Sequence, residues 1–285
     1  MEKTSIKVGI LPIPDDAALY IANVKGYFKA EGLTVQPQVI QGGAAALPQV
    51  KSGALDISIS NYVSTFLAAS KGEKVRSVGG LYQATANTFD LMVPKGSPIK
   101  TLADLRGKTI LVNTINNVGT LAVTATLKTA GLAPTDVHFA EKAFPEMANA
   151  VAAGQGDAAW MTEPFITATT AQGFTKLADT MAGETADLPV ASWIATEDWV
   201  KENPKTLAAF KRAIAKAQQL ASTDRKEVEA VLPTYTKIDA ATASKITLGV
   251  FPTSVDTGTL QKVADLMLAY KYVDKPVDVK AIVVE

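Results

Sequence analysis

The sequence predicts an α/β protein with two lobes, and three observations lead to this prediction. Strand-like and helix-like segments alternate from residue 6 to residue 195, which is typical of a mostly parallel sheet flanked by helices. The alternation forms two series, separated by the turn-rich residues 94–98, so each series is expected to build one lobe. Beyond residue 196 the pattern is helical only and predicts a helical C-terminal tail. A chain of 285 residues is long enough for two lobes with separate cores.

The first series combines apolar strand patterns with polar helix starts. Strands are predicted over 6–11, 33–40, 55–60, 75–82 and 89–93. Helices are predicted over 15–28, 42–53 and 61–71. Asp15 and Asp16 open the first helix, where negative charge is favourable beside the positive end of the helix dipole.

The second series repeats this arrangement and leads into the tail. Strands are predicted over 109–113, 136–140, 158–161, 174–177 and 189–195, and helices over 119–130, 145–153 and 164–171. The tail is predicted to form helices over 204–221, 224–232, 239–248 and 256–270. Crossings between the lobes are expected within 83–98 and 178–191. Residues 1–90 and 190–285 would then form the first lobe, and residues 91–189 the second.

Composition excludes several classes of function. Cys is absent and His occurs once, at His138, so a thiol nucleophile, a disulfide framework and a Cys- or His-rich metal site are excluded. We therefore expect neither a metal nor another cofactor. The 28 basic and 28 acidic residues give zero net charge, and no nucleic-acid partner is expected. No stretch reaches the roughly 20 apolar residues that span a bilayer.

Short turn and cap motifs follow one another in a recognisable order along the chain. They include Lys25-Gly26-Tyr27-Phe28, Glu31-Gly32-Leu33, Gly42-Gly43, Ser52-Gly53-Ala54-Leu55-Asp56, Ser97-Pro98, Gly156-Asp157-Ala158, Glu163-Pro164-Phe165 and Ala264-Asp265-Leu266-Met267. In this order and spacing the chain resembles, over nearly its whole length, a family of ABC-transporter solute-binding proteins. Members of that family bind nitrate, taurine, aliphatic sulfonates or pyrimidine precursors of thiamine.

The resemblance implies a fold, a location and partners. The fold would be the periplasmic binding protein type II fold, a Venus flytrap whose two lobes close on a small-molecule ligand. The protein would be extracytoplasmic, would act as a monomer, and would deliver its solute to the membrane permease of an ABC importer. The sequence shows neither a signal peptide nor a Cys for lipid attachment, so we expect that a signal or anchor segment has been trimmed.

Ligands of open α/β sheets bind beyond the carboxyl ends of strands, next to helix N-termini. This rule, with the aromatic residues near the predicted cleft, selects the candidate ligand-binding residues. They are Pro14, Asp15, Asp16, Gly42, Gly43, Ser60, Asn61, Tyr62, Asn116, Asn117, Trp160, Glu163 and Trp193. Structural roles stay open, because the acidic and amide residues can cap helices, the glycines can form a turn, and Trp193 can belong to the core. No catalytic residue is expected.

The predicted cleft segments contain carboxylates and aromatic rings but no Lys or Arg. This combination favours a neutral or amine-bearing heterocycle, because rings stack on flat apolar faces and cations are attracted to aromatic rings. A sulfonate, taurine or nitrate held by helix N-termini is the alternative ligand class.

Two other classes of protein compete with a binding protein. An enzyme on the same fold would resemble the thiamine-pyrimidine synthases, but those enzymes need a Cys-rich iron site and His residues that this sequence does not have. The ligand-sensing domain of a transcription regulator would need a DNA-binding module, and the sequence begins directly with a strand pattern.

Overall fold

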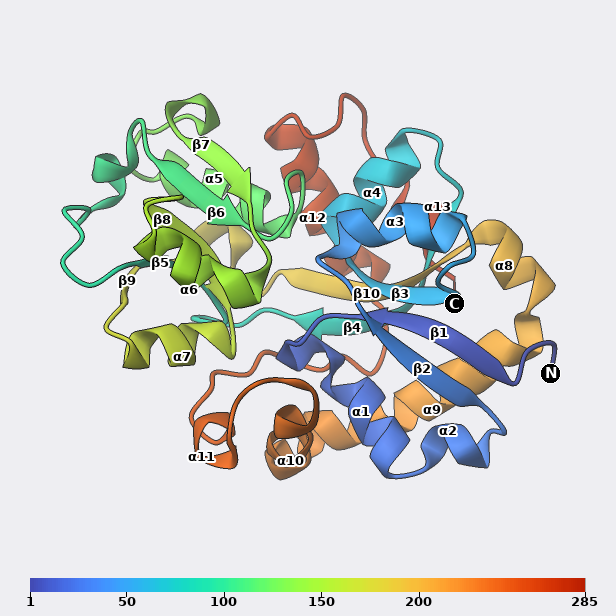
Figure 1. The fold of residues 1–285 in the computed structure, drawn as a ribbon. Helices are drawn as coiled ribbons and strands as arrows, with labels where there is room; N and C mark the ends of the chain where they lie inside the picture. The colour runs from blue at the N-terminus through green and yellow to red at the C-terminus, as the bar shows by residue number, and fades with distance from the viewer. Residues whose placement is uncertain (285) are drawn as a thin grey trace.

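The computed structural model describes residues 1–284 and shows two lobes, each built around a five-stranded sheet (Figure 1). The first sheet, ordered β2-β1-β3-β10-β4, consists of β1 (Ser5–Ile10), β2 (Thr34–Val39), β3 (Ile57–Asn61), β4 (Val75–Gln83) and β10 (Pro189–Thr196). The second, ordered β7-β6-β8-β5-β9, consists of β5 (Phe89–Val93), β6 (Thr109–Val112), β7 (His138–Glu141), β8 (Ala158–Thr162) and β9 (Thr175–Asp179). The two predicted strand series and the α/β class are confirmed.

One strand of each sheet runs against the others. Strand β10 is antiparallel to β3 and β4, and β5 is antiparallel to β8 and β9, whereas β1 and β6 lie parallel to both of their neighbours. Each reversed strand is the one that the chain enters after it has crossed from the other lobe, at residues 84–88 and 180–188. Both crossings lie within the predicted segments. The lobe boundaries at residues 90 and 190 stay a prediction.

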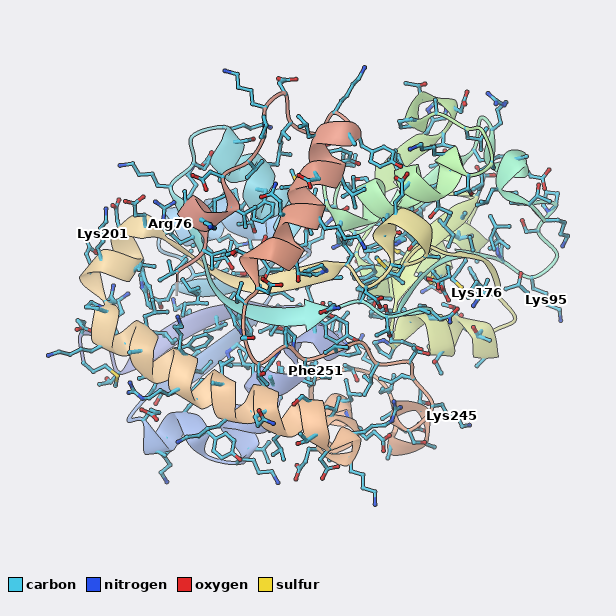
Figure 2. The ribbon with its side chains drawn as sticks, turned by 180° about the vertical axis from the view of Figure 1, so that it is seen from behind. Arg76, Lys95, Lys176, Lys201, Lys245 and Phe251 are labelled. Carbon is cyan, nitrogen blue, oxygen red and sulfur yellow. The ribbon has the colours of Figure 1, made fainter. Side chains whose placement is uncertain are left out.

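Helices cover both faces of the first sheet. One face packs against α1 (Ala17–Val24), α2 (Tyr27–Ala30), α9 (Pro204–Thr223) and α10 (Arg225–Tyr235). The other face packs against α3 (Gly43–Lys51), α4 (Tyr62–Ser70), α12 (Thr257–Ala269) and α13 (Val279–Ile282). The short α8 (Glu197–Glu202) connects β10 to α9. Seen from behind in Figure 2, α9 crosses the whole first lobe, and the buried Phe251 lies on the segment that leads into α12.

The second lobe is covered by fewer helices. They are α5 (Val118–Lys128), α6 (Phe144–Ala152) and α7 (Phe165–Ala171), together with short 3₁₀ turns η2 (Leu102–Leu105), η3 (Pro134–Asp136) and η4 (Gly183–Thr185). The tail helix α11 (Ala240–Ala243) lies below α7, so the tail reaches the second lobe (Figure 1). Aromatic residues fill the cores: Trp193 meets Phe210 edge-on in the first lobe at 5.5 Å, and Phe89 stacks on Trp160 in the second at 5.1 Å.

Two predicted helices differ from the structure. The helix expected over 15–28 is divided, because residues 14–16 form the 3₁₀ turn η1 (Pro14–Asp16) and Gly26, with φ of 72°, ends α1 in a left-handed conformation that Gly adopts easily. The helix expected over 239–248 stops at Ala243, because the chain then turns toward the sheet and Val250 pairs with Gln83 at the edge of β4. Within residues 1–284 no helix is both long and apolar enough to cross a membrane.

Candidate ligand-binding site

A small pocket lies between the lobes, where the carboxyl ends of β1, β3, β6 and β8 meet. Its lining residues are Leu11, Ile13, Asp15, Gly43, Ile59, Ser60, Asn61, Phe89, Asn113, Asn117, Val118, Phe144, Trp160, Val190 and Ala191. The free space among these residues is about 30 Å³, room for about two water molecules. The lobes therefore stand in a closed arrangement, and a metabolite can reach these residues only when they move apart.

Asp15 is the acidic residue of this pocket, and its position follows from the chain just before it. Pro14 begins the 3₁₀ turn after β1, and Asp16 Oδ2 accepts a hydrogen bond from the Leu11 N–H at 2.8 Å, which fastens the turn to the strand end. Asp15 is then 1% exposed, and its Oδ1 has no hydrogen-bond partner among the described residues. Burial raises the pKa of Asp15 to about 7. An unpaired buried carboxylate is stabilised by a ligand that brings an N–H group or a positive charge.

Asp16 lies behind Asp15 rather than in the pocket. It is fully buried, its Oδ1 has no partner in the described chain, and burial together with the nearby Asp15 charge holds its pKa well above its ordinary value. The stacked rings of Tyr20 and Tyr235, 3.9 Å apart, cover this turn, and the Tyr235 hydroxyl donates to the Ile13 carbonyl at 3.0 Å. Packing by the tail therefore keeps water from the two carboxylates.

Asn61 connects the two lobes across the pocket. Its Oδ1 accepts from the Ser64 N–H at 2.9 Å, which caps α4, and also from the Val118 N–H at 3.2 Å, at the start of α5 in the other lobe. One carboxamide oxygen thus satisfies backbone N–H groups of two facing helices. The Ser64 hydroxyl adds a bond to the Asn116 carbonyl at 3.3 Å.

Asparagines also build the side of the pocket that belongs to the second lobe. Asn117 caps α5 by accepting from the Thr120 N–H at 3.0 Å, and it donates to Asn113 Oδ1 at 2.7 Å. Asn116 is turned away and has a left-handed φ of 56°. Gly42 lies against this loop so closely that a Cβ on it would stand 2.8 Å from Asn113 Nδ2. The absence of a side chain at Gly42 lets the lobes touch here.

Trp160 lines the pocket with an edge instead of a free face. Phe89 stacks on one face, with an interplanar angle of 10°. Gly119 occupies the other side, where an added Cβ would stand 2.5 Å from a ring carbon. The indole N–H donates to Thr180 Oγ1 at 2.9 Å. A ligand therefore does not stack on Trp160 in this arrangement, although it can contact its edge and the Phe144 ring.

The structure brings some of the predicted residues together and separates others. Of the candidates, Asp15, Gly43, Ser60, Asn61, Asn117 and Trp160 line the pocket. Pro14, Asp16, Gly42 and Asn116 lie next to it and shape it.

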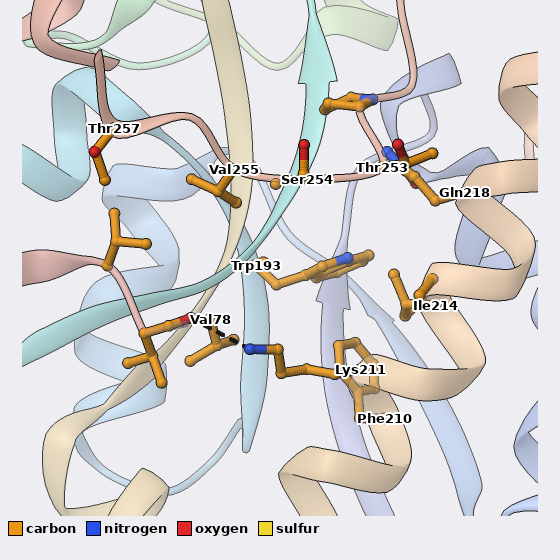
Figure 3. Close-up of a pocket in the computed structure, with 16 residues that line it drawn as sticks. Val78, Trp193, Phe210, Lys211, Ile214, Gln218, Thr253, Ser254, Val255 and Thr257 are labelled. Atoms are coloured by element: carbon orange, nitrogen blue, oxygen red, sulfur yellow. Dashed lines mark hydrogen bonds between the residues drawn. The ribbon is translucent and has the colours of Figure 1, made fainter. Parts of the chain in front are cut away.

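Tyr62, Glu163 and Trp193 lie elsewhere. Tyr62 is the buried first residue of α4, and its ring lies 5.7 Å from that of Phe66. Glu163 accepts from the Thr167 N–H in α7 and from the Thr247 N–H in the tail, so it caps a helix and links lobe to tail. Trp193 lies in a different groove, beside Phe210 and Ile214 (Figure 3).

The list of candidate residues does not include several pocket residues. They are Leu11, Ile13, Ile59, Phe89, Asn113, Val118, Phe144, Val190 and Ala191. Most are apolar residues whose sequence pattern indicates only a core position. Asn113 is the exception, because it ends a predicted strand, where the strand-end rule places ligand-binding residues.

Basic side chains do not line this pocket. None of its lining residues is Lys, Arg or His. The part of the chain that the structure describes contains no group of three or more His, Cys, Asp or Glu side chains placed to hold a metal ion. His138 is exposed at the start of β7.

Comparison with known proteins gives relatives that are mostly named as binding proteins. Residues 13–228 match the family described as NMT1/THI5 like. The chain is 27% identical over 225 residues to the putative binding protein YtlA of Bacillus subtilis, covering 76% of this chain and 67% of that protein. It is 25% identical over 193 residues to the taurine-binding periplasmic protein of Escherichia coli, covering 68% of this chain and 59% of that protein.

Solved structures agree on the fold. A protein of Bordetella bronchiseptica RB50 superimposes with a TM-score of 0.82 at 26% identity, over 100% of this chain and 95% of its own. The alkanesulfonate-binding protein SsuA of Xanthomonas axonopodis pv. citri, bound to MOPS, superimposes with a TM-score of 0.81 at 19% identity, over 100% of this chain and 99% of its own. This chain therefore has the fold of the periplasmic binding proteins and belongs to the NMT1/THI5-like family of solute-binding proteins.

Proposed function

We propose that the protein is the extracytoplasmic solute-binding component of an ABC importer and captures an amine-bearing small molecule, a heterocycle, in the pocket between its lobes. The observation that carries the ligand class is the buried Asp15 carboxylate, which lines the pocket with an unpaired oxygen and no basic residue beside it. A ligand amine supplies the missing N–H donor or positive charge.

The proposed mechanism is capture by closure. Ligand first binds one lobe, and the second lobe then completes the contacts, so the closed state is favoured by its higher affinity for the ligand. Asn61 and Asn117 would contribute both to ligand binding and to closure, because they line the pocket and also hold the helices that meet there. The closed protein would then present both lobes to a membrane permease, as the ligand-binding components of import systems among its structural relatives support.

An anionic ligand is the second candidate, and one observation favours it. The N-termini of α3, α4 and α5 converge on the pocket through Gly43, Asn61 and Val118, and helix N-termini attract anions. Two relatives are named for taurine and alkanesulfonate binding. Against this candidate, an anion would be repelled by an ionised Asp15.

Catalysis is not part of the proposal. The relatives are mostly binding proteins, although one is named a putative thiamine biosynthesis protein and one structural neighbour is the desulfurization enzyme DSZB. Asp15 is the only acidic residue that lines the pocket, so a catalytic pair of acid and base is not assembled there among the described residues.

Calorimetric titration with matched probes tests the ligand class. We expect 4-aminopyrimidine to bind more tightly than pyrimidine, which lacks the amino group, and ethanesulfonate and nitrate to bind weakly. Asp15→Asn should weaken 4-aminopyrimidine binding by about tenfold to a hundredfold, the range for a hydrogen bond to a charged group.

Asp90→Asn is the matched control for this titration. Asp90 is also buried with an unpaired oxygen, and burial raises its pKa to about 7, but it lies in β5 outside the pocket. Its variant should bind as the original protein does. Tight binding of ethanesulfonate or nitrate that strengthens in Asp15→Asn would reject the amine and support the anion.

A further inference from the structure

A second groove opens in the first lobe, on the face of the sheet that α9 covers. Its volume is about 320 Å³, which lies in the range of small-molecule pockets. Residues of β4, β10, α9 and the segments 252–257 and 283–284 line it, and Figure 3 shows Trp193, Phe210 and Ile214 facing one another inside it. It shares no lining residue with the pocket between the lobes.

The groove exists because the edge of the sheet is covered only at its ends. Strand β4 is the outermost strand, and its outer side pairs with Val283 at Ser77 and with Val250 at Gln83. Between these two bridges no further strand of the described residues pairs with β4. Gly79 and Gly80 lie in this interval: a Cβ on Gly79 would meet only the Trp193 ring, at 3.8 Å, whereas Gly80 packs closely against Val255 and Pro252. An edge with open backbone groups is suited to a partner that carries both a donor and an acceptor.

Two buried polar groups at the groove have no partner in the described chain. The Trp193 indole N–H, on a side chain 1% exposed, is unpaired, and so is Gln218 Oε1, on a side chain 2% exposed. Gln218 is held in place because its Nε2 donates to the Leu81 carbonyl at 2.6 Å. Unpaired polar groups of this kind are uncommon in native proteins and cost stability. One is a donor and the other an acceptor.

Much of the remaining lining is apolar, and Thr253, Ser254 and Thr257 add hydroxyl groups at one side of the groove. Phe210 supports the Trp193 ring edge-on, and Val78, Ile214 and Val255 surround it. Lys211 is engaged at the rim, where its Nζ donates to the Val284 carbonyl at 3.3 Å, shown by the dashed line in Figure 3. The groove therefore offers the Trp193 and Phe210 rings together with one unpaired buried N–H donor and one unpaired buried carbonyl acceptor.

We propose that this groove is a second ligand site and takes a planar, uncharged cyclic amide. The neighbouring C=O and N–H of such a lactam would pair with the Trp193 N–H and Gln218 Oε1, and its ring would lie against the apolar side chains of the lining. The site is independent of the pocket between the lobes, so it does not rest on the proposed function.

The three Trp residues make a direct test possible. In a spectrum of ¹⁵N-labelled indole groups the sequence gives three signals. Trp160 and Trp199 already donate, to Thr180 and Asp56, at 2.9 Å each, so their signals serve as internal references. Trp193→Phe assigns the third. Titration with 2-quinolone, a flat lactam, should shift the Trp193 signal saturably and leave the other two in place, whereas naphthalene, which has neither C=O nor N–H, should not.

Matched variants locate the site. Ala215, exposed on α9, lines the groove, so Ala215→Phe should fill it and weaken 2-quinolone binding by about tenfold or more. Lys205→Phe places the same ring on an exposed part of α9 outside the groove and should bind as the original protein does. Asp15→Asn should also leave this titration unchanged.

Three results would overturn the proposal. The Trp193 signal could stay fixed at millimolar 2-quinolone while the reference signals show a folded protein. Naphthalene could shift it as strongly, which would mean that the groove is only an apolar surface. The Trp160 signal could move instead, and binding would then belong to the pocket between the lobes.

Discussion

Asp15 combines an unfavourable contribution to folding with a favourable one to binding. Its burial raises its pKa from 3.8 to about 7, so the folded protein holds this proton more tightly than the unfolded chain does. The stability contributed by the protonated carboxyl is complete below about pH 4 and is lost as the pH rises through about 7. Residues that destabilise a fold while facing a pocket are typical of binding sites.

Replacing Asp15 tests whether its negative charge destabilises the folded protein. We expect Asp15→Asn to raise the melting temperature at pH 8 by several degrees, because the amide never has to be buried as a charge. At pH 4 the two proteins should melt at nearly the same temperature. Thermal denaturation from pH 4 to pH 8 measures this, and Asp90→Asn should behave similarly, because burial raises its pKa as well. A melting temperature of Asp15→Asn below that of the original protein at pH 8 would contradict the account.

Close packing against the Trp160 ring requires glycine at position 119. A Cβ at this position would stand 2.5 Å from the Trp160 ring, which is itself held by Phe89 and Thr180. Gly119→Ala should therefore destabilise the protein by about 1–3 kcal/mol through overpacking. Gly79→Ala is the control, because its nearest contact would be an ordinary 3.8 Å. Urea denaturation measures both, and equal stabilities would show that the Trp160 ring is free to move.

At the scale of elements, α4 and α5 are coupled across the lobes by Asn61. We expect Asn61→Ala to open the ligand-free protein. The hydrogen bond from the Val118 N–H to Asn61 joins the two lobes, so its loss destabilises the closed arrangement and not the open one. The sequence has no Cys, so dyes attached after Gln49→Cys and Glu146→Cys, one in each lobe, can report the separation by energy transfer.

Thr196→Ala is the control for this variant. Thr196 caps α8 by accepting from the Trp199 N–H, far from the pocket, and its loss should cost about 1 kcal/mol of stability without changing the dye separation. An unchanged separation in Asn61→Ala would mean that the lobes are held together by other contacts.

Most elements could be predicted because their apolar period and their caps are local properties of the sequence. The strand ends at Ile10, Asn61 and Val112 were placed closely enough to find Asp15, Asn61 and Asn117 at the pocket. The direction of a strand could not be predicted in this way. Strands β5 and β10 run antiparallel to their neighbours because the chain enters them after crossing between the lobes, and no local sequence pattern indicates this.

The misplaced site residues have a common physical reason. Trp193 was expected in the cleft, yet it lies further along β10 and packs edge-on against Phe210 of α9, whereas Val190 and Ala191 at the start of the strand line the pocket. Tyr62 was expected there because it follows a strand, but the helix that begins at Tyr62 turns it toward Ser77 and Ser192. Orientation around an element is set by tertiary packing, whereas position along the chain is set by sequence.

At the scale of the whole molecule, the lobes leave only about 30 Å³ of free space at the pocket between them, so binding of a metabolite there requires a hinge motion. The chain crosses between lobes at residues 84–88 and 180–188, and these segments are the natural hinges. Glu163 adds a third connection, from the second lobe to the tail at Thr247. Opening must break this contact together with those of Asn61.

A crystal structure of the protein as purified, with its interlobe pocket resolved, tests the central claim most directly. We predict density for a small molecule whose N–H group lies within about 3 Å of the Asp15 carboxylate. A sulfonate, nitrate or other anion held by the N-termini of α4 and α5, with Asp15 uncontacted, would contradict the account.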